Sequence, residues 1–341
     1  HATMKVLLIH PLGPAYATFR ARLELYLPAL RSRGLECHVT SLLRDGTTRH
    51  LGSLTRIREY DLVVVYHRIS PLLPAALERS VLDSGVPYIY DFDDAVYLEE
   101  GFLTRGKTST LISGASAVIA GSSELARYAR TFNRSISVIP TVVDLARFPE
   151  PEAPRAQARP LTIGWMGAPA TTHYLQSIAA PLRRLTASRG IRFVTVGASP
   201  LALPGVRIEQ RPWALETEIE ELMGFDVGIM PLTDDEWSRG KCGYKLVQYM
   251  AAGIPGVASP VGANREIVAD GVTGFLADTP EQWVSALERL ADDRELRARM
   301  GAAARARCEA HFSLGRTAPE LVRVFAEAAG SVATPSGIVT A

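Results

Sequence analysis

The chain carries the stretch GKCGYKLVQYMAAGIP at residues 240–255, shortly after the apolar run DVGIMP at residues 226–231. The apolar run predicts a buried strand, and the second part of the stretch predicts a helix. Two of the four lysines in the chain, Lys241 and Lys245, lie where this helix would begin. Glycines let backbone N–H groups approach an anion, the N-terminus of a helix attracts negative charge, and lysine adds a compact cation. The stretch therefore predicts a phosphate site; the alternative is a loop with two solvated lysines.

Similar apolar runs alternate with helical segments along the whole chain. They occupy residues 5–9, 37–42, 61–66, 87–91, 117–120 and 136–139 in the first half, and residues 161–166, 191–196, 206–208, 226–230 and 256–259 in the second. One helix is expected over residues 19–33, because leucines share a face there and Gly34 follows. Apolar runs separated by helices are typical of parallel sheets with helices on both faces. The expected fold class is α/β, with doubly wound, Rossmann-like domains.

A proline-rich segment at residues 148–160 interrupts this alternation. It holds four prolines and no periodic apolar face, as expected of an interdomain linker. We expect an N-terminal domain over residues 4–150 and a second domain over residues 160–312. A last helix, at residues 313–329, is expected to pack back on the first domain. Ligands of such sheets bind beyond the carboxyl ends of the strands, so a cleft between the two domains is the expected site.

Composition limits the class of protein. The 341 residues carry a formal charge of +1, which argues against nucleic acid as the main partner. The three cysteines, Cys37, Cys242 and Cys308, have neither the number of a disulfide framework nor the spacing of a zinc site. No signal peptide is visible, and no apolar run reaches the ~20 residues of a membrane span. We therefore expect a cytoplasmic protein without a transmembrane segment.

Several residues that follow predicted strands are further candidates. Asp93, in the run DFDD at residues 91–94, suits contact with substrate hydroxyls or, as an alternative, a Mg²⁺ or Mn²⁺ ion. We favour substrate contact, because the lysine-rich site already supplies positive charge. Gly167 ends a strand before a Thr pair, which fits a second anion site or an ordinary turn with a Thr N-cap. Arg211 and Trp213 would flank a flat base, although a structural Trp is an equal alternative.

The run at residues 241–276 resembles the donor-binding signature of the family 4 retaining glycosyltransferases, which have the two-domain GT-B fold. The run IPTVVD at residues 139–144 and the turn at Gly167 extend the resemblance to most of residues 4–329. The resemblance implies that the first domain binds the acceptor and the second domain binds the donor. It also extends to antibiotic-tailoring transferases of actinobacteria, such as the avilamycin pathway enzyme.

The resemblance implies a role for individual residues. Gly243, Tyr244 and Lys245 would meet the donor pyrophosphate, with Cys242 among them, and Lys241 and Lys245 would replace a family Arg/Lys pair that is missing after Gly167. Gln248 stands where the family usually has a Glu that holds the ribose, and Gly240 stands where it often has another Glu. Asp93 would replace a histidine near the donor sugar. Gly13 matches a glycine loop near the phosphates, and Arg211 and Trp213 match the base-binding turn.

The function implied is transfer of a sugar, with retention of configuration, from a UDP- or GDP-linked donor to a hydroxyl of a small molecule or glycan. The departing phosphate would act as the base, so no enzymic nucleophile is required. We expect no permanent cofactor, and no metal because the lysine-rich site already supplies positive charge. Two alternatives stay open: a nucleotide-sugar 2-epimerase on the same fold, and a two-domain binding protein for small ligands that is not an enzyme.

Overall fold

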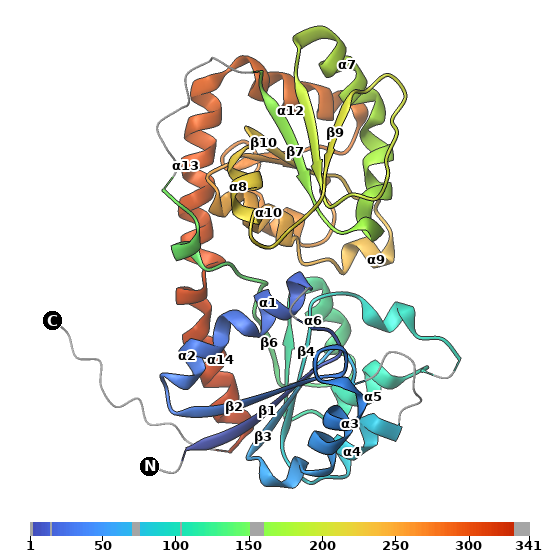
Figure 1. Cartoon of the computed structure of the whole chain (residues 1–341), viewed down its shortest axis with the longest axis vertical. Coiled ribbons are helices and arrows are strands. Elements are labelled where there is room, and N and C mark those ends of the chain that lie inside the picture. Colours follow the sequence, from blue (N-terminus) through green and yellow to red (C-terminus); the bar gives the residue numbers. More distant parts are fainter. Residues whose placement is uncertain (1–2, 14–15, 70–75, 103, 151–159, 331–341) are drawn as a thin grey trace, which may run out of the picture. The chain divides into compact units, whose positions relative to one another are not determined.

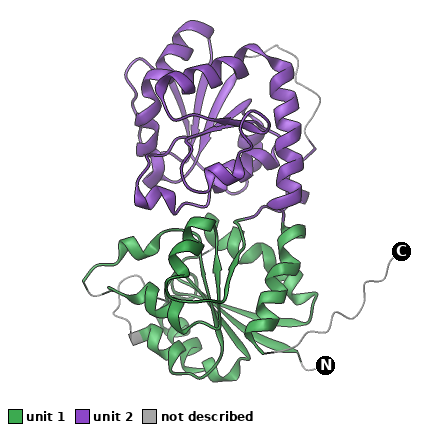
Figure 2. Ribbon diagram, turned by 180° about the vertical axis from the view of Figure 1, so that it is seen from behind, with its two compact units in different colours: residues 1–141, 314–341 green, residues 142–313 purple. Residues whose placement is uncertain are grey.

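The computed structural model describes residues 3–13, 16–69, 76–102, 104–150 and 160–330. The chain divides into two compact units (Figure 2). Unit 1 holds residues 1–141 and 314–341, and unit 2 holds residues 142–313. Residues 151–159 of the expected linker lie outside the described part.

Unit 1 is built on a six-stranded parallel sheet in the order β2-β1-β3-β4-β5-β6 (Figure 1). Its strands are β1 (Met4–His10), β2 (Leu35–Ser41), β3 (Leu62–Tyr66), β4 (Tyr88–Phe92), β5 (Ala117–Ala120) and β6 (Ile136–Val138). Its helices are α1 (Ala17–Arg22), α2 (Leu27–Arg31), α3 (Leu42–Thr55), α4 (Ala76–Leu82), α5 (Lys107–Gly114), α6 (Ser123–Ala129) and α14 (Leu314–Ala328). Short 3₁₀ segments lie at Glu24–Tyr26, Ile57–Glu59 and Val96–Glu99. Strands β3 and β4 are buried along their whole length, as expected of a sheet with helices on both faces.

The helix expected over residues 19–33 is broken into α1, a 3₁₀ turn and α2. Leu23 leaves the helical region, and Pro28 lies at the start of α2. Pro28 has no N–H to donate to the carbonyl of Glu24, which disfavours one continuous helix at this point, so the single helix was a wrong prediction. Helix α14 packs against α2 and β4 of unit 1, where the hydroxyls of Tyr26 and Thr317 form a hydrogen bond of 2.8 Å.

Unit 2 repeats the architecture, with the strand order β12-β11-β10-β7-β8-β9. Its strands are β7 (Thr162–Met166), β8 (Arg192–Val196), β9 (Ile208–Arg211), β10 (Val227–Met230), β11 (Gly256–Ala258) and β12 (Gly274–Leu276). Its helices are α7 (Ala179–Arg189), α8 (Glu218–Met223), α9 (Glu236–Arg239), α10 (Tyr244–Ala251), α11 (Asn264–Ile267), α12 (Pro280–Asp292) and α13 (Arg294–His311), with 3₁₀ segments at Leu145–Arg147 and Pro169–Ile178. The strand predicted at residues 206–208 begins only at Ile208.

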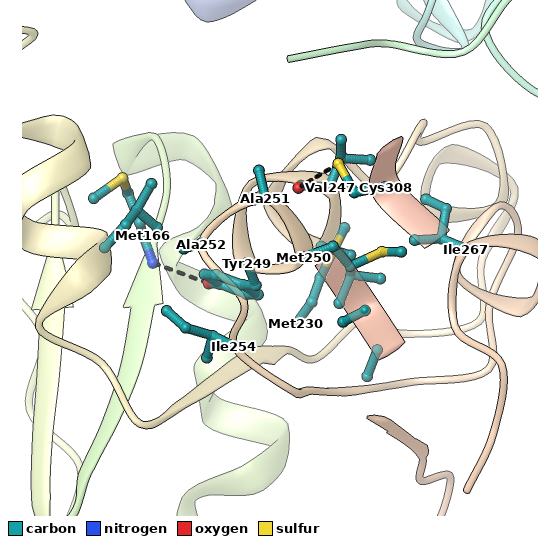
Figure 3. Packing of buried hydrophobic residues seen from close by; sticks show 14 of the residues in the cluster. Met166, Met230, Val247, Tyr249, Met250, Ala251, Ala252, Ile254, Ile267 and Cys308 are labelled. Carbon is teal, nitrogen blue, oxygen red and sulfur yellow. Dashed lines mark hydrogen bonds between the residues drawn. The ribbon is translucent and has the colours of Figure 1, made fainter. Parts of the chain in front are cut away.

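The core of unit 2 fixes α10 against the sheet (Figure 3). The Tyr249 hydroxyl accepts a hydrogen bond from the backbone N–H of Met166 and donates one to the carbonyl of Ile229, both at 3.2 Å. The ring of Tyr249 lies so close to β10 that a side chain at Gly228 would come within 2.3 Å of it. These contacts hold α10 against β7 and β10.

Candidate functional site

The loop that enters α10 depends on Gly243. This residue is the N-cap of the helix and has a φ of 67°, a conformation that favours glycine. A Cβ at this position would also lie 2.3 Å from the Cδ1 atom of Ile267. Any other residue at position 243 would therefore disturb the backbone of this loop. The loop leads into the N-terminus of α10, which carries a partial positive charge.

Gly167 and Lys245, which the sequence placed in separate motifs, lie in contact. Gly167 follows β7 and donates its N–H to the carbonyl of Val196 at 3.0 Å. A Cβ on Gly167 would come within 2.5 Å of the Lys245 Cε atom and 2.7 Å of the Trp165 ring. The Lys245 ammonium stands 5.4 Å from the centroid of that ring, within the range of a cation–π interaction. The absence of a side chain at Gly167 thus leaves the space that the lysine stem occupies.

The turn after Gly167 is an anion-site candidate rather than a threonine-capped helix. The 3₁₀ segment that follows has Ala168 at its N-cap, without a capping side chain. The Thr171 hydroxyl donates to the Ala168 carbonyl instead, and the Thr172 hydroxyl accepts from the N–H of Ser199. The capping alternative was therefore wrong, and the anion-site reading stays a prediction.

The other predicted residues of the stretch lie around the same helix start. The Lys241 ammonium is 5.0 Å from the centroid of the Trp237 ring. Cys242 is a buried free thiol, and Tyr244 is half-buried at the first position of α10. Two cations therefore lie within the first turn of α10 or just before it, in a region suited to a negatively charged group.

A buried carboxylate that the sequence reading missed joins two of the predicted residues. The Glu218 Oε1 atom accepts hydrogen bonds from Trp213 Nε1 and from Gln248 Nε2, each at 3.2 Å. Glu218 is 5% exposed and begins α8. The local signal for it was weak, because an acidic residue in the first turn of a helix is common and usually solvated. The negative charge that Gln248 lacks is therefore present next to its amide.

Arg211 ends β9 and is engaged by carboxylates. Its guanidinium donates to Glu209 and, at 2.5 Å, to Glu221, and it is about one-third exposed. Trp213 packs nearby, because a Cβ on Gly197 would lie 3.0 Å from the Trp213 Cβ atom. The predicted base contact of Trp213 stays a prediction, and Arg211 would have to share its donors with two glutamates to take part.

In unit 1, Asp93 lies just after β4 in a buried polar cluster. Its Oδ1 atom accepts a hydrogen bond from the Tyr66 hydroxyl and lies 3.0 Å from His67 Nε2, while Oδ2 lies 3.4 Å from the Thr141 hydroxyl. Burial by itself would raise the pKa of Asp93, but the hydrogen bond and charge of His67, together with Arg22 and Tyr66, lower this pKa to about 2. Asp93 is thus an ionised group whose oxygens already have partners.

A second buried carboxylate, Asp91, is paired with Arg22. The guanidinium donates to Asp91 Oδ1 and also to the carbonyl of Ile139 at 2.5 Å. The two aspartates that suggested a metal site therefore accept hydrogen bonds from different side chains. Among the described residues, no group of three or more His, Cys, Asp or Glu side chains is placed to hold a metal ion.

His67 follows β3 directly, and its backbone is unusual. It is the one residue other than glycine with a positive φ, 55°, in the part of the chain that the structure describes. Such a conformation costs a side-chain-bearing residue about 1 kcal/mol or more and often marks a functional position. Gly13, the remaining predicted residue of unit 1, follows β1 and accepts a hydrogen bond from the Tyr16 N–H at 3.0 Å.

Comparison with known proteins identifies the family that unit 2 resembles. Residues 160–293 match the family described as Glycosyl transferases group 1. The D-inositol 3-phosphate glycosyltransferase of Paenarthrobacter aurescens is 34% identical over 112 residues, which are 32% of this chain and 26% of the relative. The enzyme of the same name from Streptomyces griseus is 45% identical over 69 residues, 20% of this chain and 15% of the relative. The match thus spans about a quarter or less of these curated relatives.

Solved structures match both units. HepE of Anabaena, in complex with UDP and glucose, has a TM-score of 0.72 at 17% identity, covering 94% of this chain and 98% of that one. Sucrose-phosphate synthase from Thermosynechococcus elongatus has a TM-score of 0.72 at 14% identity, covering 95% and 98%. The predicted fold class is confirmed: the chain has two parallel sheets with flanking helices, as GT-B glycosyltransferases do. The described residues include no helix long and apolar enough to cross a bilayer.

Proposed function

We propose that the chain is a glycosyltransferase that moves a sugar from a nucleotide diphosphate donor to a hydroxyl acceptor. The proposal is supported by the match of residues 160–293 to the group 1 glycosyltransferases and by the GT-B fold. The observation that carries it is the contact between Gly167 and Lys245 beside the N-terminus of α10. A flexible cation next to helix-end N–H groups is suited to a diphosphate.

In this proposal, Lys245 and the start of α10 stabilise the negative charge that grows on the diphosphate as the glycosidic bond breaks. Lys241 adds a second cation, and Gln248 with Glu218 offers both an amide and a carboxylate to ribose hydroxyls. In unit 2, Arg211 and Trp213 keep the base-binding role that the resemblance gives them, and in unit 1, Gly13 and Asp93 keep the phosphate and sugar roles that it gives them. We favour UDP over GDP, because HepE was solved with UDP, with UDP-glucose, and with UDP and glucose.

The finer assignments rest on the resemblance alone. Retention of configuration implies that the departing phosphate takes the acceptor proton, so that the bond to the leaving oxygen breaks while the acceptor oxygen bonds to the same face of the sugar. Proton NMR of the first product formed from UDP-glucose tests this assignment, since an α-anomer supports retention and a β-anomer contradicts it. A role in antibiotic biosynthesis is the accompanying hypothesis for the acceptor.

Lys245→Ala tests the central claim. Removal of one charge-stabilising donor commonly lowers turnover by ~10²-fold, and we expect a loss of that size in kcat/KM with UDP-glucose. The matched control is Lys5→Ala, since Lys5 is exposed at the opposite, N-terminal end of a strand in unit 1. Thermal-shift measurements with UDP, GDP, ADP and dTDP come first, because a ligand at 100 times its Kd stabilises a protein by about 2.7 kcal/mol. A Lys245→Ala protein as active as Lys5→Ala would refute the role of Lys245.

A further inference from the structure

The carboxyl end of β3 presents a histidine in a constrained setting. The backbone N–H of His67 donates to the carbonyl of Asp91 at 2.9 Å, and its side-chain Nε2 atom lies 3.0 Å from Asp93 Oδ1. The ring also stacks on Tyr66, with 3.9 Å between centroids and 18° between planes. Two hydrogen bonds to the β4 strand and its end, together with a ring stack, therefore hold His67 in its positive-φ conformation.

These contacts determine which ring nitrogen carries the proton. A carboxylate oxygen only accepts hydrogen bonds, so the 3.0 Å contact requires a hydrogen on His67 Nε2. The backbone N–H of Asp93 is 3.4 Å from the same nitrogen and would need the opposite tautomer. The shorter contact, to a charged acceptor, is the stronger one. In the neutral form of His67, this tautomer leaves a lone pair on Nδ1.

The Nδ1 atom of His67 is the candidate for contact with a ligand. Within the described residues it has no hydrogen-bond partner, and the imidazole is 10% exposed. Asp93, in contrast, is 4% exposed and already accepts from Tyr66 and His67. Of these two side chains, the histidine is the one with a ring nitrogen that no other described residue contacts by a hydrogen bond.

We propose that His67 is a substrate-binding residue whose Nδ1 atom accepts a hydrogen bond from a hydroxyl of the sugar donor or of the acceptor. Asp93 is then the positioning residue that fixes the tautomer, which changes its assigned role from direct contact with the sugar. The chemistry is the same for both sources, because a hydroxyl donates to a neutral imidazole. The proposal rests on the proposed glycosyltransferase function.

Three charged or titratable groups lie around His67. The His10 ring stacks against Tyr66, with 4.1 Å between the ring centroids. Burial and then His67 lower the pKa of His10 to about 3, so His10 stays uncharged. Asp91, beside His67, is paired with Arg22. Asp93 is thus the carboxylate whose contact orients the imidazole.

The first test reads the tautomer directly in the whole chain. Long-range ¹H–¹⁵N NMR of protein labelled with ¹⁵N-histidine, with His67→Gln to assign the signal, should show His67 with hydrogen on Nε2 and a bare Nδ1 at pH 8. Addition of UDP-glucose or of D-inositol 3-phosphate, the second in the presence of UDP, should shift the Nδ1 resonance, whereas UDP alone should not. Hydrogen on Nδ1, or an Nδ1 resonance unmoved by both ligands, would overturn the proposal.

The second test separates the two sources of the hydroxyl. One hydrogen bond is worth roughly tenfold in affinity, so His67→Gln should raise either the Kd of UDP-glucose or the KM of D-inositol 3-phosphate by about that factor. The Kd of UDP should not change in either case. His38→Gln is the matched control, since His38 is an exposed histidine of unit 1.

Equal values for His67→Gln and His38→Gln would refute the role of His67, and if His67→Gln does not fold, the NMR titration of the wild type decides. A wild type that binds no nucleoside diphosphate would instead refute the proposed function, independently of the tautomer.

Discussion

Substitution of Gly167 by alanine should disable the candidate donor site while the fold survives. The added Cβ would lie 2.5 Å from Lys245 Cε and 2.7 Å from two ring carbons of Trp165. Carbon atoms pack at about 3.5–4.0 Å, so neighbouring atoms must move by about 1 Å. The Lys245 stem ends in a flexible chain and can move, whereas Trp165 is 1% exposed and fixed in the core. We therefore expect the ammonium to be displaced by the substitution.

Two effects of different size should follow. Overpacking against Trp165 should lower the free energy of unfolding of unit 2 by about 1–3 kcal/mol. A displacement of a catalytic cation by about 1 Å should lower kcat/KM for UDP-glucose by ~10²-fold. All four tryptophans, at positions 165, 213, 237 and 283, lie in unit 2, so their fluorescence follows the unfolding of this unit alone.

Gly164→Ala is the matched control for this prediction. It lies on the same strand, but its Cβ would collide with the buried ring of Phe225, at 2.0 Å, and not with Lys245. We expect it to lose at least as much stability and to keep the kcat/KM of the wild type per folded molecule. The reasoning would be refuted by a fully active Gly167→Ala protein, or by equal losses of activity per folded molecule in both variants.

Three further predictions concern the stability of unit 1 and the loop that enters α10. The pKa of Asp93 is about 2 in the folded chain against 3.8 in a free side chain, so the carboxylate stabilises unit 1 above about pH 4 and loses this contribution, about 2 kcal/mol, as the pH falls toward 2. In urea unfolding followed by circular dichroism, the free energy of unfolding of Asp93→Asn should therefore fall less at acid pH than that of the wild type. An equally steep fall in both proteins would contradict this. Gly243→Ala should weaken UDP binding in calorimetry, because the residue has a φ of 67° and the added Cβ would collide with Ile267. An unchanged affinity would argue against a role of this loop in UDP binding. Tyr26→Phe removes the hydrogen bond to Thr317 and should lower the free energy of unfolding of unit 1 by about 1 kcal/mol. An unchanged free energy of unfolding in urea titration would count against a stabilising role of that bond.

The sheets could be predicted because their strands are buried on both faces and therefore read as continuous apolar runs. The run at residues 62–66 in β3 and the run at residues 227–230 in β10 are examples. The break in the helix at residues 19–33 was missed because leucine spacing was given more weight than Pro28, whose ring cannot continue a helix from the preceding turn. Local pattern thus predicted the strands better than the ends of the helices.

The candidate site was predictable only where its residues are neighbours in the chain. Gly243 and Lys245 share one motif, so a single stretch identified both. The pairing of Glu218 with Gln248 joins residues 30 positions apart and depends on how α8 lies beside α10. The positive φ of His67 arises from hydrogen bonds to Asp91 and Asp93 at the end of the next strand. Neither feature leaves a signal in the local sequence, because tertiary contacts create both.

The polar cluster of unit 1 is more easily explained by function than by stability. Buried ion pairs such as Arg22 with Asp91 lose about as much free energy on desolvation as they regain by attraction, and apolar side chains of similar size often stabilise a core better. The strained backbone of His67 adds a further cost. Both features lie where β3 and β4 end, the edge at which parallel sheets bind ligands. A stability cost concentrated at that edge is what the proposed binding role of unit 1 predicts, and this unit lies outside the family match at residues 160–293.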